Sequence, residues 1–174
     1  IESGETVRSL PGHAGGWRIS QFSRDGSRVI SIRPNNTVFI ARSANGEKIA
    51  DFDPGGFVLG VAEGPDGQIL IALRQTDASE PAVRLAAYSG RGALLSQVVF
   101  AGDFRGLWAS PDGQHFLLAM DGQNDSVFGA TQGLRPLENG RFQIGEPLLT
   151  VPFSPGGRWG LALTAGSTRT PFAL

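Results

Sequence analysis

The sequence predicts an all-β fold in which a four-stranded unit is repeated about four times. A turn-like pentapeptide recurs at residues 22–26, 63–67, 109–113 and 153–157. The final glycines of these pentapeptides are 41, 46 and 44 residues apart, a period that is typical of repeat proteins. The chain also has 25 Gly and 11 Pro, and it lacks a long stretch with the apolar spacing of an amphipathic helix. We therefore expect strands and tight turns throughout.

The repeated pentapeptides are predicted to join the first and second strands of each unit. Two of them contain Pro-Asp-Gly, at residues 65–67 and 111–113. Proline presets φ at the second position of a turn, aspartate bonds to the nearby backbone, and glycine adopts the positive φ that closes the turn. This chemistry is typical of β-hairpins.

An apolar run follows each turn and is predicted to be a strand buried on both faces. The runs cover residues 29–32, 69–73, 116–120 and 159–163. Their length and their boundaries of Gly, Pro and Asp favour strands over helices. A third strand is expected at 37–41 and 83–88, and a fourth, more polar one at 47–52. Four strands within 41–46 residues is typical of one blade of a β-propeller.

Residues 12–42 resemble a WD40 repeat. The matching residues are Gly12-His13, Ile19, Phe22-Ser23, Asp25-Gly26, Val29, Ser31 and Thr37-Val38. The chain departs from the family where it has Ala41-Arg42 in place of Trp-Asp, and Asn35 in place of Asp. Of the buried hydrogen-bonded set that the family forms, only His13 and Ser31 carry over. The later repeats lose Gly-His and are similar to the looser WD40-like repeats of bacterial propellers, including the TolB-like group. The resemblance implies a fold and does not specify a function.

The predicted blades cover residues 12–53, 54–104, 105–150 and 151–174 plus 1–10, so that residues 1–174 are a single propeller domain or a propeller fragment. Residues 5–10 occupy the place of an outermost strand and would complete the last blade. Two architectures are consistent with this count: a closed four-bladed ring, or four consecutive blades of a seven- or eight-bladed ring completed by missing sequence or a second chain. The start at Ile1 in place of Met favours the second.

The composition argues against several classes of function. The net charge of −1 gives no pull toward nucleic acid, and no run approaches the roughly 18 apolar residues of a membrane-spanning helix. The chain has no Cys and two histidines, His13 and His115, neither in a recognisable nucleophile context. The oxygen-rich residues 121–126 lack the downstream Glu of a calcium loop. We expect no catalytic residues, metal site or cofactor. The compartment stays open between a periplasmic or secreted and a cytoplasmic location.

The predicted binding residues lie in loops on one face of the ring. In this topology the connections from fourth to next first strand, and from second to third strand, share that face. They bring together Trp17, Arg18, Arg33, Arg74, Phe104 and Arg105. Aromatic residues and Arg are enriched in protein interfaces, although Trp17 and Phe104 could instead anchor their loops to the core. Trp108 and Trp159 are expected to pack between blades.

These observations predict a non-catalytic protein-interaction or scaffolding module. Its partner would be a protein, with another propeller half or a second copy among the options, and we expect neither nucleic acid nor membrane insertion. The alternative function is binding of a small molecule or carbohydrate at the central channel, as part of a larger enzyme.

Overall fold

The structure is a computed structural model that describes residues 16–76, 79–121, 126–142, 148–154, 157, 159–164 and 169–173. Three of its sheets have four strands and one has three. The first two sheets contain β1 (Ile19–Phe22), β2 (Arg28–Ile32), β3 (Val38–Arg42) and β4 (Lys48–Phe52), then β5 (Val58–Glu63), β6 (Ile69–Arg74), β7 (Ala82–Tyr88) and β8 (Leu94–Ala101). The last two contain β9 (Phe104–Ala109), β10 (His115–Met120), β11 (Ser126–Ala130) and β12 (Arg135–Phe142), then β13 (Leu148–Thr150), β14 (Trp159–Thr164) and β15 (Arg169–Ala173). Two short 3₁₀ turns, η1 (Pro65–Gly67) and η2 (Gln132–Leu134), interrupt the pattern.

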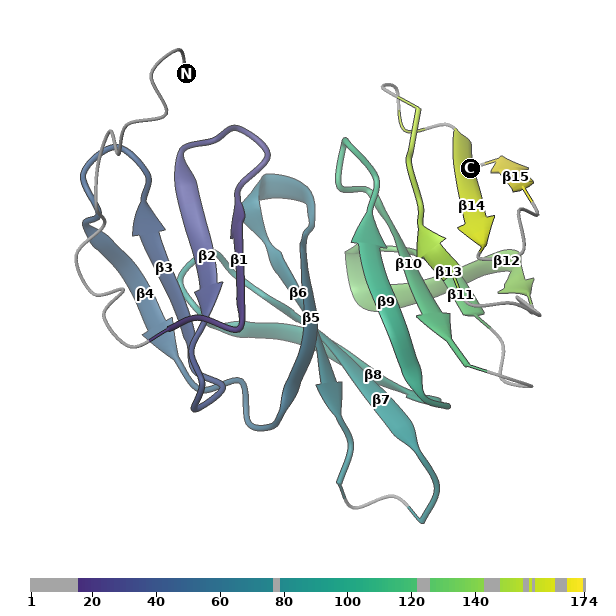
Figure 1. Cartoon of the computed structure of the whole chain (residues 1–174), viewed down its shortest axis with the longest axis horizontal. Coiled ribbons are helices and arrows are strands. Elements are labelled where there is room, and N and C mark those ends of the chain that lie inside the picture. The colour runs from purple at the N-terminus through teal and green to yellow at the C-terminus, as the bar shows by residue number, and fades with distance from the viewer. Residues whose placement is uncertain are drawn as a thin grey trace.

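Each sheet is an antiparallel meander in which strands pair in chain order. The all-β prediction is therefore confirmed, and the strands expected at 37–41, 47–52 and 83–88 are β3, β4 and β7. Figure 1 shows the four sheets standing side by side in an arc, with the first and the last at opposite ends. The predicted outer strand at residues 5–10, and His13, lie outside the described residues.

The predicted turns have the expected backbone, with positive φ at Gly26, Gly67, Gly113 and Gly157. Asp25 and Asp112 accept backbone N–H groups two residues on, each at 3.0 Å. The hydrogen bond from Ser23 holds the pKa of Asp25 well below its ordinary value. At Asp112, burial raises the pKa, but the hydrogen bonds from Ser110 and from the backbone of Gln114 outweigh burial and lower the pKa.

The turn serines have a second role that the sequence did not reveal. Ser23 Oγ accepts the backbone N–H of Arg28 at 2.9 Å, and Ser110 Oγ accepts that of His115 at 3.0 Å. Each hydroxyl thus satisfies the first N–H of the second strand in its blade. This contact explains why a serine precedes the turn in more than one repeat, because a buried donor without a partner is costly.

The cores lie between neighbouring sheets. The middle strands β2, β6 and β10 are buried almost completely, as predicted. Ile30 and Ile71 belong to the cluster between the first and second sheets, and Leu70 and Leu118 to the cluster between the second and third. All four side chains are fully buried. Neighbouring blades are thus held together by face-to-face packing of their apolar surfaces.

Two expectations about the fourth sheet are wrong. Trp159, expected between blades, is 58% exposed, and Leu161 and Leu163 are only half-buried. Strand alternation turns Gly160 inward and Trp159 outward, and within the described residues the fourth sheet has a neighbouring sheet on one side only (Figure 1). Trp108, in contrast, packs against the cluster between the third and fourth sheets, as expected.

Candidate binding face

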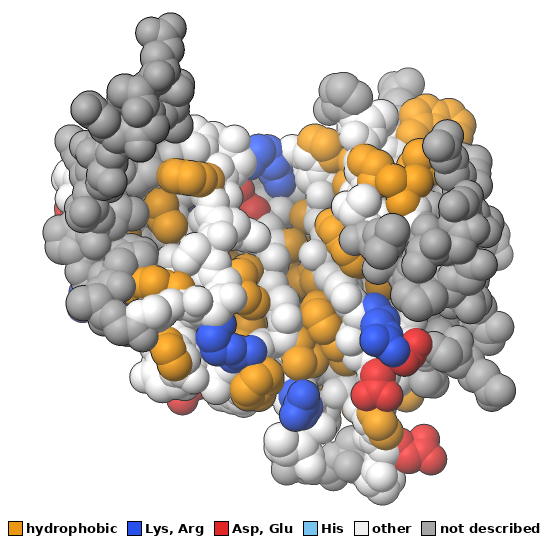
Figure 2. All heavy atoms as spheres, viewed as in Figure 1, with side chains coloured by type: hydrophobic (Ala, Val, Ile, Leu, Met, Phe, Trp, Pro, Cys, Tyr) orange, Lys and Arg blue, Asp and Glu red, His pale blue; other side chains and the backbone are white. Residues whose placement is uncertain are grey.

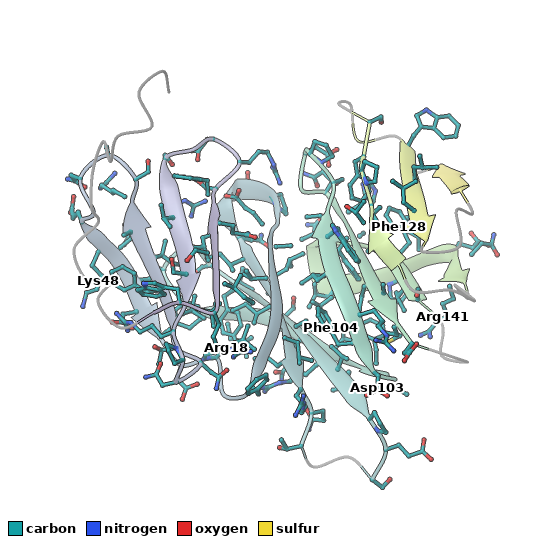
Figure 3. The ribbon with its side chains drawn as sticks, in the orientation of Figure 1. Arg18, Lys48, Asp103, Phe104, Phe128 and Arg141 are labelled. Atoms are coloured by element: carbon teal, nitrogen blue, oxygen red, sulfur yellow. The ribbon has the colours of Figure 1, made fainter. Side chains whose placement is uncertain are left out.

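The six predicted binding residues lie at the same end of their sheets. Trp17 and Arg18 precede β1, Arg33 follows β2, Arg74 ends β6, and Phe104 and Arg105 begin β9. Because antiparallel neighbours run in opposite directions, the start of a first strand and the end of a second strand meet at one end of a blade. We call this end the loop face. Figure 3 shows two of its residues, Arg18 and Phe104, toward the lower end of the inner strands.

An exposed ring, Phe57, forms the centre of the loop face. The Arg18 Cζ lies 4.1 Å from the centroid of the Phe57 ring, and the Arg74 Cζ lies 5.1 Å from it. Phe57 itself is 40% exposed. It belongs to the connection between β4 and β5, and it was missed as a candidate although that connection was predicted to reach this face. Figure 2 shows basic and apolar side chains next to one another along this end.

Arg18 is held in place by neutral acceptors. Its Nη2 donates to the carbonyl of Val58 at 3.0 Å, and its Nη1 donates to Asn36 Oδ1. The same Asn36 oxygen accepts the Val58 N–H at 3.3 Å. Among the described residues, neither Arg18 nor Arg74 forms an ion pair. Within the described residues, no carboxylate is therefore bonded to either of the two guanidinium groups that lie over the Phe57 ring.

The loop that carries Phe57 is fixed to the second sheet. Arg84 Nη2 donates to the carbonyl oxygens of Pro54 and Gly55 at 3.3 and 2.5 Å, and the Tyr88 hydroxyl donates to Pro54 at 3.0 Å. Burial raises the pKa of Tyr88, which keeps its hydroxyl in the donating form. Phe57 is thus presented from a loop with several long-range anchors.

Trp17 and Arg33 form a more inward pair. The rings of Trp17 and Phe39 are 5.7 Å apart, and the Arg33 Cζ lies 4.7 Å from the Phe39 centroid and 5.6 Å from that of Trp17. Arg33 also forms an ion pair with Asp51 at 2.7 Å. Trp17 is half-buried, which agrees with the interpretation that it anchors its loop.

Phe104 and Arg105 lie at the third sheet and have partners of their own. The Phe104 ring covers Gly60, where an added Cβ would come within 2.6 Å of it. Arg105 forms an ion pair with Asp121, and this hydrogen bond raises the pKa of Arg105 further. A groove of about 340 Å³ between Phe104 and Arg74 is also lined by Glu80 and Asp103. Arg105 thus differs from Arg18 and Arg74 in that its charge is paired with a carboxylate.

A second groove, of about 290 Å³, runs along the inner strands β1, β5 and β9. If a small molecule or carbohydrate bound at the central channel, as the alternative function predicts, it would lie in this groove. Phe22, 68% exposed, and Trp108 contribute to its wall. Arg24 donates its backbone N–H to the carboxylate of Glu63 and its guanidinium to the backbone carbonyl of Glu63. The channel ligand stays a prediction.

Within the part of the chain that the structure describes, no three His, Asp or Glu side chains lie close enough to hold a metal ion. The helical segments found there are also too short to cross a membrane. Residues 122–125 of the loop with calcium-like composition lie outside that part.

Solved structures share this arrangement of blades. The C-terminal WD40 domain of Sif2 superposes with a TM-score of 0.68 at 14% identity, over 95% of this chain and 48% of that one. The β-propeller domain of Myceliophteria thermophila Cps50 (Swd1) superposes with a TM-score of 0.67 at 16% identity, over 98% of this chain and 54% of that one. The fold is that of a WD40-like β-propeller.

The resemblance found in residues 12–42 is thereby confirmed at the level of fold. This WD40-like chain spans about half the length of the two solved chains. No protein-family model matches its sequence, and no curated protein matches it significantly.

Proposed function

We propose that this chain is a non-catalytic protein-interaction module that binds a protein partner through its loop face. The observation that carries the proposal is the placement of Arg18 and Arg74 over the exposed ring of Phe57, at 4.1 and 5.1 Å. Arg and aromatic side chains are enriched among the residues that dominate binding energy. The WD40-like fold supports the same class of function, since propellers of this kind typically mediate protein interactions.

The charge of this patch indicates the chemistry of the partner. Two guanidinium groups that form no ion pair within the described residues can each take a carboxylate in a bidentate hydrogen-bonded pair. The ring between them supplies apolar contact area. We therefore expect an acidic segment of the partner, with Asp or Glu beside an apolar residue. The flanking residues Trp17, Arg33, Phe104 and Arg105 extend the contact.

Replacing both Arg18 and Arg74 with Ala tests this function. Truncating a central anchor costs about 2 kcal/mol, or a loss of roughly 30-fold in affinity. We expect the double variant to lose the proteins that the unaltered chain captures from a native lysate, measured by quantitative mass spectrometry, while its melting temperature is kept. Arg42→Ala with Arg91→Ala, at the opposite end of the sheets, is the matched control. Equal capture by both double variants would reject the loop face.

We also propose that the four blades are consecutive blades of a larger ring. The arc of sheets in Figure 1 and the coverage of about half of each solved propeller chain support it. Seven or eight blades is the expected total, with the remainder from further sequence or from a second chain.

Engineered cysteines can distinguish an arc from a closed ring, because the chain has no Cys of its own. Ser20 on β1 and Thr150 on β13 are exposed positions on inner strands. In a closed four-bladed ring these strands would be neighbours, as β5 and β9 are. We expect that a short bismaleimide does not link Ser20→Cys to Thr150→Cys within one chain, as measured by mass spectrometry of the peptides after proteolysis of the monomer. Efficient intramolecular linkage would establish the closed ring.

A further inference from the structure

The outermost strand of the second sheet, β8, has an unusual edge. Its sequence, LLSQVVFA, contains neither a charged residue nor a proline over eight positions. It pairs with β7 on one side, and no strand pairs with its other side among the described residues. The short turn η2 contacts β8 through Leu134, which belongs to the same apolar cluster as Val98 and Phe100. Leu94, Leu95 and Val99 are 50%, 52% and 54% exposed. A long, apolar, uncharged edge is a template for pairing with another strand.

The other complete sheets of the chain protect the corresponding edge. The outer strand β4 carries Lys48 and Asp51, and β12 carries Pro136 and Arg141 together with a shift in register. Figure 3 shows Lys48 and Arg141 on these outer strands. Charges, proline and irregular register are the devices by which natural sheets prevent edge-to-edge pairing. The pairing of β8 with β7 also shifts in register, at Ala87 and Tyr88, but β8 has neither a charged residue nor a proline. In these two respects its edge differs from its two equivalents in the same molecule.

The ladder determines which backbone groups of β8 point outward. Gly102 donates its N–H to the carbonyl of Pro81 at 2.7 Å, and the same register pairs Val83 with Phe100 and Leu85 with Val98. Antiparallel pairs alternate between bonded and non-bonded residues. Phe100 and Val98 therefore bond to β7, whereas Gln97 and Val99 direct their N–H and C=O groups away from it.

We propose that a second copy of this chain pairs with β8 along this edge, antiparallel and through a twofold axis. An axis at Val98 sets Gln97 of one copy opposite Val99 of the other. Both residues have outward N–H and C=O groups, so each such pair forms two backbone hydrogen bonds. The two four-stranded sheets become one sheet of eight strands. A twofold contact requires a self-complementary surface, and the β8 edge supplies one.

Charge also favours a second copy at this edge. Self-pairing of β4 or β12 would bring charged side chains together, whereas β8 brings none. The nearest basic group on the exposed face, Arg84 of β7, donates to the carbonyls of Pro54 and Gly55 and, within its own sheet, to the Gln97 side chain at 3.4 Å. Pairing of one strand buries less area than a standard stable interface, so the dimer belongs to the weak, concentration-dependent class. This proposal uses a surface other than the loop face and does not depend on it.

Substitutions at Val99 test the proposal. Val99→Pro removes an outward N–H and leaves the bonds to β7 intact, and proline is tolerated on an edge in this orientation. Val99→Lys places two like charges near each other at the twofold contact. We expect a concentration-dependent dimer of the unaltered chain in sedimentation equilibrium and native mass spectrometry. Both variants should be monomeric. Val99→Pro should keep a melting temperature close to that of the unaltered chain, whereas Val99→Lys should lower it slightly, because position 99 lies opposite Arg84 in the same sheet.

Two further variants serve as controls. Val99→Thr keeps the N–H and a β-branched side chain and should retain the dimer. Val98→Pro removes an N–H that bonds to β7 and should lower the melting temperature. If Val99→Pro fails to fold, Val99→Lys still decides the question. A monomeric unaltered chain across the whole concentration range, or a dimer that survives Val99→Lys, would overturn the proposal; the second result would place the contact between copies elsewhere.

Discussion

Replacing Phe116 with Ala is expected to lower the free energy of unfolding by about 3–5 kcal/mol, the usual cost of truncating a buried aromatic side chain. Phe116 is the second residue of β10, is fully buried, and belongs to the cluster between the second and third sheets. Its ring covers Gly129 of β11 so closely that a Cβ there would come within 2.5 Å of it. Its removal would therefore leave a cavity that the neighbouring strand cannot fill. Urea unfolding followed by circular dichroism measures the effect.

Phe22→Ala is the matched control for this prediction. It makes the same chemical change on β1, but the Phe22 side chain is 68% exposed. Exposed substitutions usually change stability by no more than about 0.5 kcal/mol. Similar losses for the two variants would mean that the cluster around Phe116 contributes no more to stability than the surface does.

Glu63→Ala is expected to give the second large effect, a loss of about 2–4 kcal/mol, because it leaves a largely buried cation without its partner. Glu63 on β5 receives Arg28 Nη2 of β2 at 2.5 Å, with side chains only 11% and 17% exposed. Its other carboxylate oxygen accepts the backbone N–H of Arg24. Arg28 also donates to the carbonyl of Gly67 at 3.2 Å. One carboxylate thus joins the turn ends of the first two sheets.

The surface pair of Arg42 and Glu47 provides the control for Glu63. The two side chains are 60% and 62% exposed and lie 3.1 Å apart. Exposed ion pairs contribute about 0–1 kcal/mol, so Glu47→Ala should leave the unfolding midpoint nearly unchanged. If Glu63→Ala has no larger effect, the link between the first two sheets comes from the apolar cluster alone. Thermal and urea unfolding of both variants measure the difference.

The local pattern of the chain determined its fold class. Pro-Asp-Gly and the related turns act through the preferences of adjacent residues, so their positive glycine φ values at Gly26, Gly67 and Gly113 follow from the sequence alone. The apolar runs after these turns similarly gave the fully buried middle strands. The expectation for Trp159 was wrong because burial depends on a neighbouring sheet as well as on apolar character.

Contacts between distant parts of the chain were decided by the tertiary structure. Arg18, Phe57 and Arg74 come from three different connections, and only the packing of the first two sheets places both guanidinium groups on one ring. The sequence grouped Arg105 with Arg18 and Arg74, yet Arg105 forms an ion pair with Asp121, whereas the other two form none among the described residues. The unprotected edge of β8 likewise depends on which side of the strand β7 occupies. Turn and strand preferences are local free energies, whereas these arrangements depend on which surfaces meet when the sheets pack.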